Sequence, residues 1–139
     1  MPSAYVVDDT GDIRFLMKLL LAHCGLEVLE APTGTAFLDE LAAGVRPDVV
    51  VLDLQMPELD GWDTLQAIRE RRDLDAVAVV ICSVKAGRDD RRRAWELGCD
   101  GYISKPFANG AFVDEITTVL ARSPDERRAL RARQIVGAT

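Results

Sequence analysis

Five polar side chains in this sequence lie at the ends of short, mainly apolar runs, and their chemical types are those of a phosphate or metal site. They are, in chain order, Asp8, Asp9, Asp53, Ser83 and Lys105. The run VVVL leads into Asp53, for example, and VAVVIC leads into Ser83. Each residue alone is typical of a strand end that meets water. Together they predict a shared site, provided that the fold brings the ends of these runs to one place.

The segments between these runs have helical periodicity, and this alternation is typical of a parallel sheet wrapped by helices. We count five such units and predict an α/β fold with a doubly wound, five-stranded parallel sheet and five flanking helices. Because parallel strands end at the same edge of a sheet, where doubly wound folds bind their ligands, the five polar side chains should converge. The expected strands are 4–8, 26–31, 49–53, 77–83 and 101–105, and the expected helices cover about 12–25, 35–43, 62–71, 88–98 and 109–121.

The apolar pattern also orders the strands. The run at 26–31 alternates apolar and acidic residues, which indicates an edge strand. The runs at 49–53 and 77–83 are apolar almost throughout, which indicates central strands buried on both faces.

Three ionised carboxylates, Asp8, Asp9 and Asp53, are unfavourable in one cleft without a cation among them. These positions offer only hard oxygen ligands, so Mg²⁺ is the natural choice and Mn²⁺ an expected substitute. Mg²⁺ commonly completes its coordination with phosphate oxygens, which indicates phosphoryl chemistry. Asp53 follows a central strand, and we expect it to be the nucleophile that forms an acyl phosphate. Lys105 would neutralise charge on the phosphoryl oxygens, and Ser83 would donate a hydrogen bond to one of them.

The composition is that of one globular domain: 139 residues, 48% hydrophobic and 29% charged. No apolar run approaches the roughly 20 residues of a membrane span, and the N-terminus lacks the features of a signal peptide. We therefore expect a cytoplasmic protein with no membrane partner. Cys24, Cys82 and Cys99 show no CxxC spacing, which favours reduced thiols over a disulfide or a zinc site.

The charge is divided unevenly along the chain. Residues 1–121 hold 12 basic and 21 acidic residues, a net charge of −9, whereas residues 122–139 hold five arginines and two acidic residues, a net charge of +3. The acidic body disfavours direct contact with nucleic acid. The tail opens with Ser123, Pro124 and Glu126, the pattern of a helix capping box. We predict one domain at 1–121 and a basic, helical C-terminal extension or linker at 122–139, which an unseen module could follow.

Four segments, VVDD, VVVLDLQMPELDG, VICS and GYISKPF, closely resemble the receiver domain of bacterial two-component response regulators. The resemblance covers about residues 3–121, and it is most specific from Asp53 through Met56, Pro57, Asp60 and Gly61. It implies a flavodoxin-like sheet with strand order 2-1-3-4-5. It also implies a signalling domain rather than an enzyme, one that assists its own phosphorylation and dephosphorylation.

Carried onto this chain, the resemblance implies that Asp53 accepts a phosphoryl group from a sensor histidine kinase or a histidine phosphotransfer protein. Asp8, Asp9, Asp53 and the backbone carbonyl of Gln55 would hold Mg²⁺. The partner that reads the phosphorylated state is unknown from the sequence.

The resemblance also implies a switch. A cis peptide bond before Pro106 would aim Lys105 into the cleft, and Tyr102 would move inward as Ser83 is drawn to the phosphoryl group. The response would then leave through an output face that binds a downstream protein or a second copy of the chain. That face would consist of the helix at 88–98, the strand at 101–105 and the helix at 109–121.

Two residues depart from the family pattern. Where the family commonly has a very small residue after the strand hydroxyl, this chain has Val84, followed by Lys85. Gln55 and Lys85 each lie two residues past a site residue, and in extended backbone they would flank the phosphoryl group. We expect Lys85 to shield the acyl phosphate from water, while Gln55 could orient a water and Val84 could narrow the entrance.

Two other functions compete with the phosphoacceptor. A phosphatase of the haloacid dehalogenase class also uses an aspartate nucleophile, but it needs a second acid two residues later, where this chain has Gln55 after Asp53 and Thr10 after Asp8. A receiver-like module that signals without phosphate remains open because of Val84, although all five site residues are present.

Overall fold

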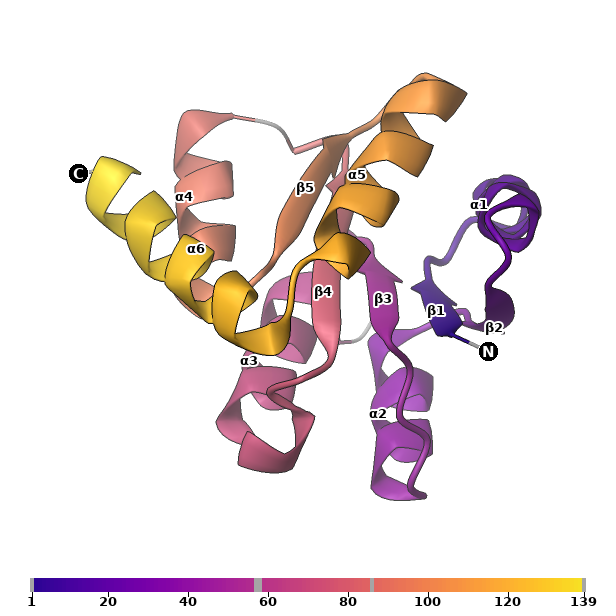
Figure 1. The fold of residues 1–139 in the computed structure, drawn as a ribbon. Coiled ribbons are helices and arrows are strands. Elements are labelled where there is room, and N and C mark those ends of the chain that lie inside the picture. The colour runs from indigo at the N-terminus through magenta and orange to yellow at the C-terminus, as the bar shows by residue number, and fades with distance from the viewer. Residues whose placement is uncertain (1, 57–58, 86, 139) are drawn as a thin grey trace.

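The computed structural model describes residues 2–56, 59–85 and 87–138, and it contains one parallel sheet of five strands in the order β2-β1-β3-β4-β5 (Figure 1). The predicted fold and strand order are therefore confirmed. Every residue of β3 and β4 is buried, whereas β2 is largely exposed at the edge, as the apolar patterns indicate. The strands are β1 (Ser3–Val7), β2 (Glu27–Ala31), β3 (Val49–Leu52), β4 (Ala78–Ser83) and β5 (Gly101–Ser104).

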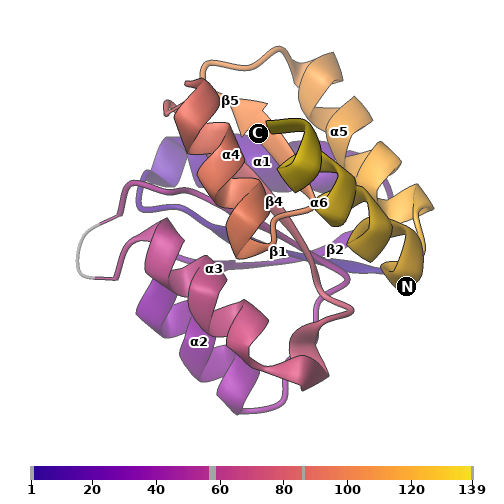
Figure 2. The ribbon, with the colours of Figure 1, turned by 90° about the vertical axis from the view of Figure 1, so that its left-hand side faces the viewer.

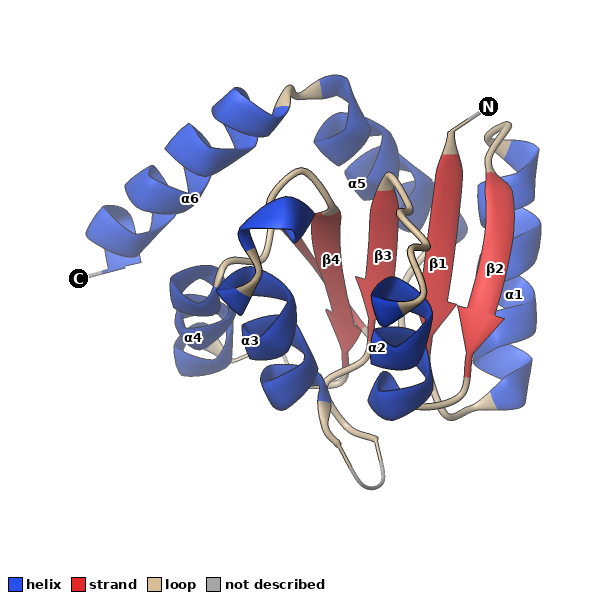
Figure 3. Ribbon diagram, turned by 90° about the horizontal axis from the view of Figure 1, so that it is seen from below, coloured by secondary structure: helices blue, strands red, loops and turns tan. Residues whose placement is uncertain are grey.

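Helices cover both faces of the sheet, and each face has its own apolar core. Side chains of α1 and α5, such as Met17 and Phe112, pack on one face, and those of α2, α3 and α4, such as Phe37 and Leu65, pack on the other (Figure 3). These helices are α1 (Gly11–His23), α2 (Gly34–Ala42), α3 (Gly61–Glu70), α4 (Arg88–Leu97) and α5 (Asn109–Ala121). No helix in the described part of the chain combines the length and apolar character needed to cross a membrane.

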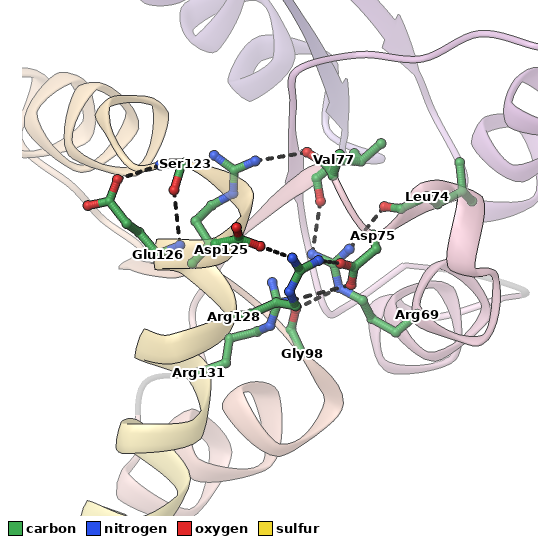
Figure 4. A network of polar contacts seen from close by, with 12 residues as sticks. Arg69, Leu74, Asp75, Val77, Gly98, Ser123, Asp125, Glu126, Arg128 and Arg131 are labelled. Carbon is green, nitrogen blue, oxygen red and sulfur yellow. Dashed lines mark hydrogen bonds and ion pairs between the residues drawn. The ribbon is translucent and has the colours of Figure 1, made fainter.

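The structure contains one more α-helix than the five expected around the sheet. This helix, α6 (Pro124–Ala138), follows α5 and runs alongside α4 (Figure 2). It begins with the capping box: the Ser123 hydroxyl accepts from the Glu126 N–H at 3.1 Å, and the Glu126 carboxylate accepts from the Ser123 N–H at 3.0 Å (Figure 4). A short 3₁₀ helix, η1 (Arg72–Leu74), also precedes β4.

The strand register decides which polar side chains meet. Val7 of β1 pairs with Leu52 of β3, so Asp8 and Asp53, the next residue on each strand, lie side by side. The strands themselves end one residue earlier than predicted in three places, because the hydrogen-bonded ladders stop at Val7, at Leu52 and at Ser104. Asp8, Asp53 and Lys105 therefore lie just beyond their strands, at the carboxyl edge of the sheet, while Ser83 is the last residue of β4.

Candidate functional site

Three carboxylates meet at the carboxyl edge of the sheet. Asp8 and Asp53 are buried, with exposed fractions of 1% and 6%, and Asp9 is exposed. One carboxylate oxygen from each residue lies within 4.8 Å of the others. The predicted convergence is present, and the oxygens are close enough to share one small cation.

Lys105 directly follows β5, an edge strand of the sheet, and its side chain extends to these carboxylates. Its ammonium nitrogen lies 2.6 Å from a carboxylate oxygen of Asp8 and 3.3 Å from one of Asp53. The peptide bond between Lys105 and Pro106 is cis. We call Asp8, Asp9, Asp53 and Lys105 the acidic cluster, since it holds three carboxylates and one ammonium group.

Burial and charge act in opposite directions within the acidic cluster. Burial raises the pKa of Asp53, and the nearby Lys105 only partly offsets this effect. Burial alone would lower the pKa of Lys105, but its hydrogen bond to Asp8 and the charge of Asp53 raise that pKa overall. Lys105 therefore stays positive at neutral pH, and its charge does not fully offset the effect of burial on Asp53.

Backbone groups hold the two buried carboxylates in place. The N–H of Thr10 donates to Asp8 at 2.9 Å, and the N–H of Gln55 donates to Asp53 at 3.2 Å. Arg14, on the first turn of α1, donates to the backbone carbonyl of Asp8 at 2.6 Å. Sequence reasoning missed Thr10 and Arg14, since neither position carries a pattern that links it to the carboxylates.

Gly61 is required where α3 begins. A Cβ at this position would lie 2.1 Å from the carbonyl oxygen of Asp53 and 2.6 Å from the Cα of Leu54. The N–H of Gly61 donates to the carbonyl of Leu54 at 3.0 Å, which closes the loop after β3. Any side chain would push α3 away from the strand that carries Asp53.

Ser83 and Tyr102 are joined through one backbone segment. The fully buried Ser83 hydroxyl accepts from the N–H of Lys85 at 3.1 Å, and the Tyr102 hydroxyl donates to the carbonyl of Lys85. Tyr102 is itself buried, with its ring beneath the guanidinium of Arg91 at 4.7 Å. Ser83 and Tyr102 therefore both contact the backbone of Lys85, from its N–H and its carbonyl respectively.

The three residues assigned to phosphoryl lifetime lie beyond the strand ends. Gln55 follows the end of β3 at Leu52, and Lys85 follows the end of β4 at Ser83. The side chains of Gln55 and Lys85 are exposed, and Val84 is 59% exposed. Within the segment VVVLDLQMPELDG named from the sequence, Pro57 and Glu58 lie outside the described residues.

The acidic cluster fits a divalent cation. It offers carboxylate oxygens, the ligands that Mg²⁺ and Mn²⁺ prefer, and it carries more negative than positive charge in a partly buried place. Asp8, Asp9 and Asp53 would hold such an ion.

The sequence is similar to those of known transcriptional regulatory proteins. The chain is 34% identical over 122 residues to the KDP operon transcriptional regulatory protein KdpE of Escherichia coli. The aligned region covers 88% of this chain and 52% of KdpE. It is 37% identical over 121 residues to the transcriptional regulatory protein PrrA of Mycobacterium tuberculosis. The aligned region covers 87% of this chain and 51% of PrrA. The chain thus spans about half the length of these curated relatives.

Solved structures agree with this likeness. The response regulator DrrB of Thermotoga maritima, a homologue of OmpR and PhoB, matches with a TM-score of 0.78 and 26% identity, over 88% of this chain and 54% of that chain. A beryllofluoride-activated DrrB receiver domain gives the same TM-score and identity, over 88% of this chain and 99% of that chain. Residues 4–117 match the response regulator receiver domain. The chain therefore belongs to the receiver domain family of two-component response regulators.

Proposed function

We propose that this receiver domain is a phosphoacceptor, in which Asp53 takes a phosphoryl group from a sensor histidine kinase or a histidine phosphotransfer protein in the cytoplasm. The observation that carries this proposal is the charge imbalance of the acidic cluster: three carboxylates face one ammonium group. Receiver domains are signalling domains, and the modified domain itself would be the signal rather than a released product.

The residues of the cluster divide the chemistry among them. A carboxylate oxygen of Asp53 would attack phosphorus as the bond from phosphorus to the donor imidazole nitrogen breaks, which leaves an acyl phosphate. Lys105, positive and adjacent to Asp53, would pair with a phosphoryl oxygen, and Ser83 would donate a hydrogen bond to another. Mg²⁺, when bound by Asp8, Asp9 and Asp53, supplies positive charge to the phosphoryl oxygens. The backbone carbonyl of Gln55 is the remaining protein ligand that we propose.

The phosphoryl group would be read on the output face, formed by α4, β5 and α5. Ser83 would turn from Lys85 toward the phosphoryl group, which would alter the segment that contacts the hydroxyl of Tyr102. The partner that binds the output face would be a downstream protein or a second copy of the chain, with no direct nucleic-acid contact by this domain.

Amide exchange on adding beryllofluoride should change mainly at residues 84–108. Changes confined to α1 and α2 would refute this route.

The phosphorylation site has a direct test. Incubation with acetyl phosphate and Mg²⁺ should add one phosphoryl group, detected as a mass increase that disappears in acid or base. Asp53→Asn should abolish the increase, because it removes the attacking oxygen. Asp39→Asn, on the exposed side of α2, removes the same charge elsewhere and should leave the increase intact. Labelling that survives Asp53→Asn would place the site elsewhere.

The lifetime of the acyl phosphate provides a second test. The exposed Lys85 side chain is long enough to cover the phosphoryl group and pair with one of its oxygens. Lys85→Ala should hasten loss of phosphate from the isolated protein, whereas Lys18→Ala on α1 should not. An unchanged half-life in Lys85→Ala would show that this lysine does not protect the acyl phosphate.

A further inference from the structure

A groove of about 530 Å³ opens beside α4, on the side where α6 lies. Its walls come from four elements, because Arg88 belongs to α4, Tyr102 to β5, Glu115 to α5 and Gln134 to α6. The sixth helix therefore adds a wall to the output face. We call this site the arginine groove.

The arginine groove is basic, although the domain around it is acidic. Three guanidinium groups line it, those of Arg88, Arg91 and Arg92, against the single carboxylate of Glu115. Burial raises the pKa of Glu115, so this carboxylate takes up a proton more readily than an exposed one does. Residues 1–121 as a whole carry a net charge of −9.

Two arginines of the groove, Arg88 and Arg92, can still accept a ligand, whereas Arg91 already donates to the hydroxyl of Ser104 at 2.8 Å. Arg92 forms ion pairs with Asp89 at 3.6 Å and Glu96 at 3.8 Å, but all three side chains are exposed, where such pairs contribute little. Arg88 is also exposed at the start of α4. A carboxylate that enters the groove could form shorter, charge-assisted hydrogen bonds with these guanidinium groups.

A buried ion-pair network holds α6 in place. It lies at the amino edge of the sheet, opposite to the carboxyl edge that carries the acidic cluster. Arg131 of α6 lies 2.5 Å from one oxygen of the fully buried Asp100, and Arg69 of α3 lies 2.8 Å from the other. Asp100 also accepts from the N–H of Val79 at 2.9 Å. We call Asp100, Arg69 and Arg131 the arginine lock. Since it joins α6 to the sheet and to α3, the wall made by α6 is fixed.

Neighbouring arginines of α6 strengthen this attachment. Arg127, 7% exposed, donates to the carbonyl of Ala76 at 2.9 Å. Arg128 pairs with Asp75, and Figure 4 shows Arg128 and Arg131 turned toward Asp75 beside Arg69. The basic charge of the tail is therefore used partly to attach α6 to the domain.

We propose that the arginine groove binds an acidic segment, rich in aspartate and glutamate, of the protein that reads the output face. This inference rests on the proposed function for the identity of that face. Trp95 and Tyr102 provide an apolar lining beside the three guanidinium groups, which suits a peptide whose acidic side chains alternate with apolar ones. A nucleic acid fits less well, because a longer polyanion would meet the acidic body on leaving the groove.

Tyr102 links this groove to the acidic cluster. Its ring lines the groove, and its hydroxyl donates to the carbonyl of Lys85, two residues past Ser83. A bound acidic segment would thus contact the residue that is placed to respond to Asp53.

The test uses the full 139-residue chain and a fluorescein-labelled hexaglutamate peptide, with fluorescence anisotropy as the readout. The peptide should bind, and added salt should weaken the binding. The double variant Arg88→Gln with Arg92→Gln should lower the affinity about tenfold or more, since it removes two charge-assisted contacts. The matched control, Arg71→Gln with Arg72→Gln, removes the same charge near η1 and should keep the affinity within roughly threefold.

Three outcomes would overturn the inference: no binding of hexaglutamate, an equal loss in both double variants, or tighter binding of labelled hexathymidylate than of the peptide. Melting temperatures identify a variant that has lost its fold, and the exposed single variant Arg88→Gln then serves in place of the double one. Phosphorylation of Asp53 is measured by mass on the same samples. If the wild-type chain is phosphorylated but does not bind the peptide, the groove alone is refuted. If the wild-type chain binds the peptide but is not phosphorylated, the proposed function alone is refuted.

Discussion

Two charged clusters, each with buried carboxylates, lie at opposite edges of the same sheet, and their charge balance differs. The acidic cluster at the carboxyl edge has three carboxylates for one ammonium group. The arginine lock at the amino edge has one buried carboxylate, Asp100, for two guanidinium groups and one backbone N–H, and the partly exposed Asp75 lies 3.5 Å from Arg131. The second cluster satisfies its buried carboxylate fully, whereas the first does not.

We interpret this difference as that between a structural cluster and a candidate functional one. A buried charge is tolerated when partners surround it, and removing a partner is costly. Asp100 has such partners, and its contacts join α3, α6 and the sheet. Asp53 has fewer than its burial demands, which is why its pKa is raised. Excess like charge of this kind marks a place prepared for a ligand that is itself positive.

The largest effect should come from the arginine lock. Asp100→Asn removes the buried carboxylate and leaves Arg69 and Arg131 close together, with only the partly exposed Asp75 near them. We expect the free energy of unfolding to fall by about 3–5 kcal/mol, measured by urea denaturation. Asp114→Asn, on the exposed side of α5, should change it by less than roughly 0.5 kcal/mol. A small loss in Asp100→Asn would show that the lock is not a structural cluster.

Removal of one arginine should have a smaller effect. In Arg131→Met the buried Asp100 keeps Arg69 and the N–H of Val79, so we expect a loss of about 2 kcal/mol in the free energy of unfolding. Limited proteolysis should then cut within α6 sooner than in the wild type. Arg133→Met, at an exposed position of the same helix, is the control and should match the wild type. Equal proteolysis of all three proteins would contradict a role for the lock in holding α6.

The acidic cluster should respond with the opposite sign. In metal-free buffer at neutral pH, Asp53→Asn should raise the free energy of unfolding on the order of 1 kcal/mol, because it removes an ionised carboxylate that burial disfavours. Lys105 keeps its contact of 2.6 Å with Asp8. Added Mg²⁺ should stabilise the wild type more than the variant.

The pH dependence of this gain follows from the raised pKa of Asp53. The folded domain holds the proton of Asp53 more tightly than the unfolded chain does, so the wild-type penalty appears only as pH rises above the ordinary carboxyl pKa of 3.8. The difference between Asp53→Asn and the wild type should therefore vanish as pH falls toward that value. A difference that persists in acid would assign the gain to packing instead of charge.

The two clusters also differ in how far the sequence could predict them. The acidic cluster was predictable because Asp8, Asp53 and Lys105 each follow an apolar run, and parallel strands all end at one edge. The arginine lock joins residues 31 positions apart on either side of Asp100, and no local pattern connects them. Arg131 was interpreted as part of a basic extension, since net charge gives no information on which arginines are buried.

Local geometry explains the other differences from expectation. The need for Gly61 comes from the close approach of α3 to the carbonyl of Asp53, a distance that only the folded chain defines. The positions of Gln55 and Lys85 were inferred from an extended backbone, but both lie past the ends of their strands. Side chains alternate between the two faces only while the backbone stays in a strand, so the inference about these two residues does not hold beyond the strand ends.

The smallest effect, and the sharpest comparison of the two edges, concerns two buried thiols. Cys82 lies one residue before Ser83 at the carboxyl edge, and Cys99 lies one residue before Asp100 at the amino edge; both are fully buried. Burial raises the pKa of Cys82 to about 12 and raises the pKa of Cys99 as well, so both should react slowly with iodoacetamide at neutral pH. The partly exposed Cys24 should react first.

Loosening the arginine lock should open the amino edge only. In Arg131→Met we therefore expect alkylation of Cys99 to accelerate roughly two- to tenfold while that of Cys82 stays unchanged, as measured by peptide mass mapping. Equal acceleration at both thiols would mean that the two edges open together, and that the lock stabilises the whole domain rather than its own edge.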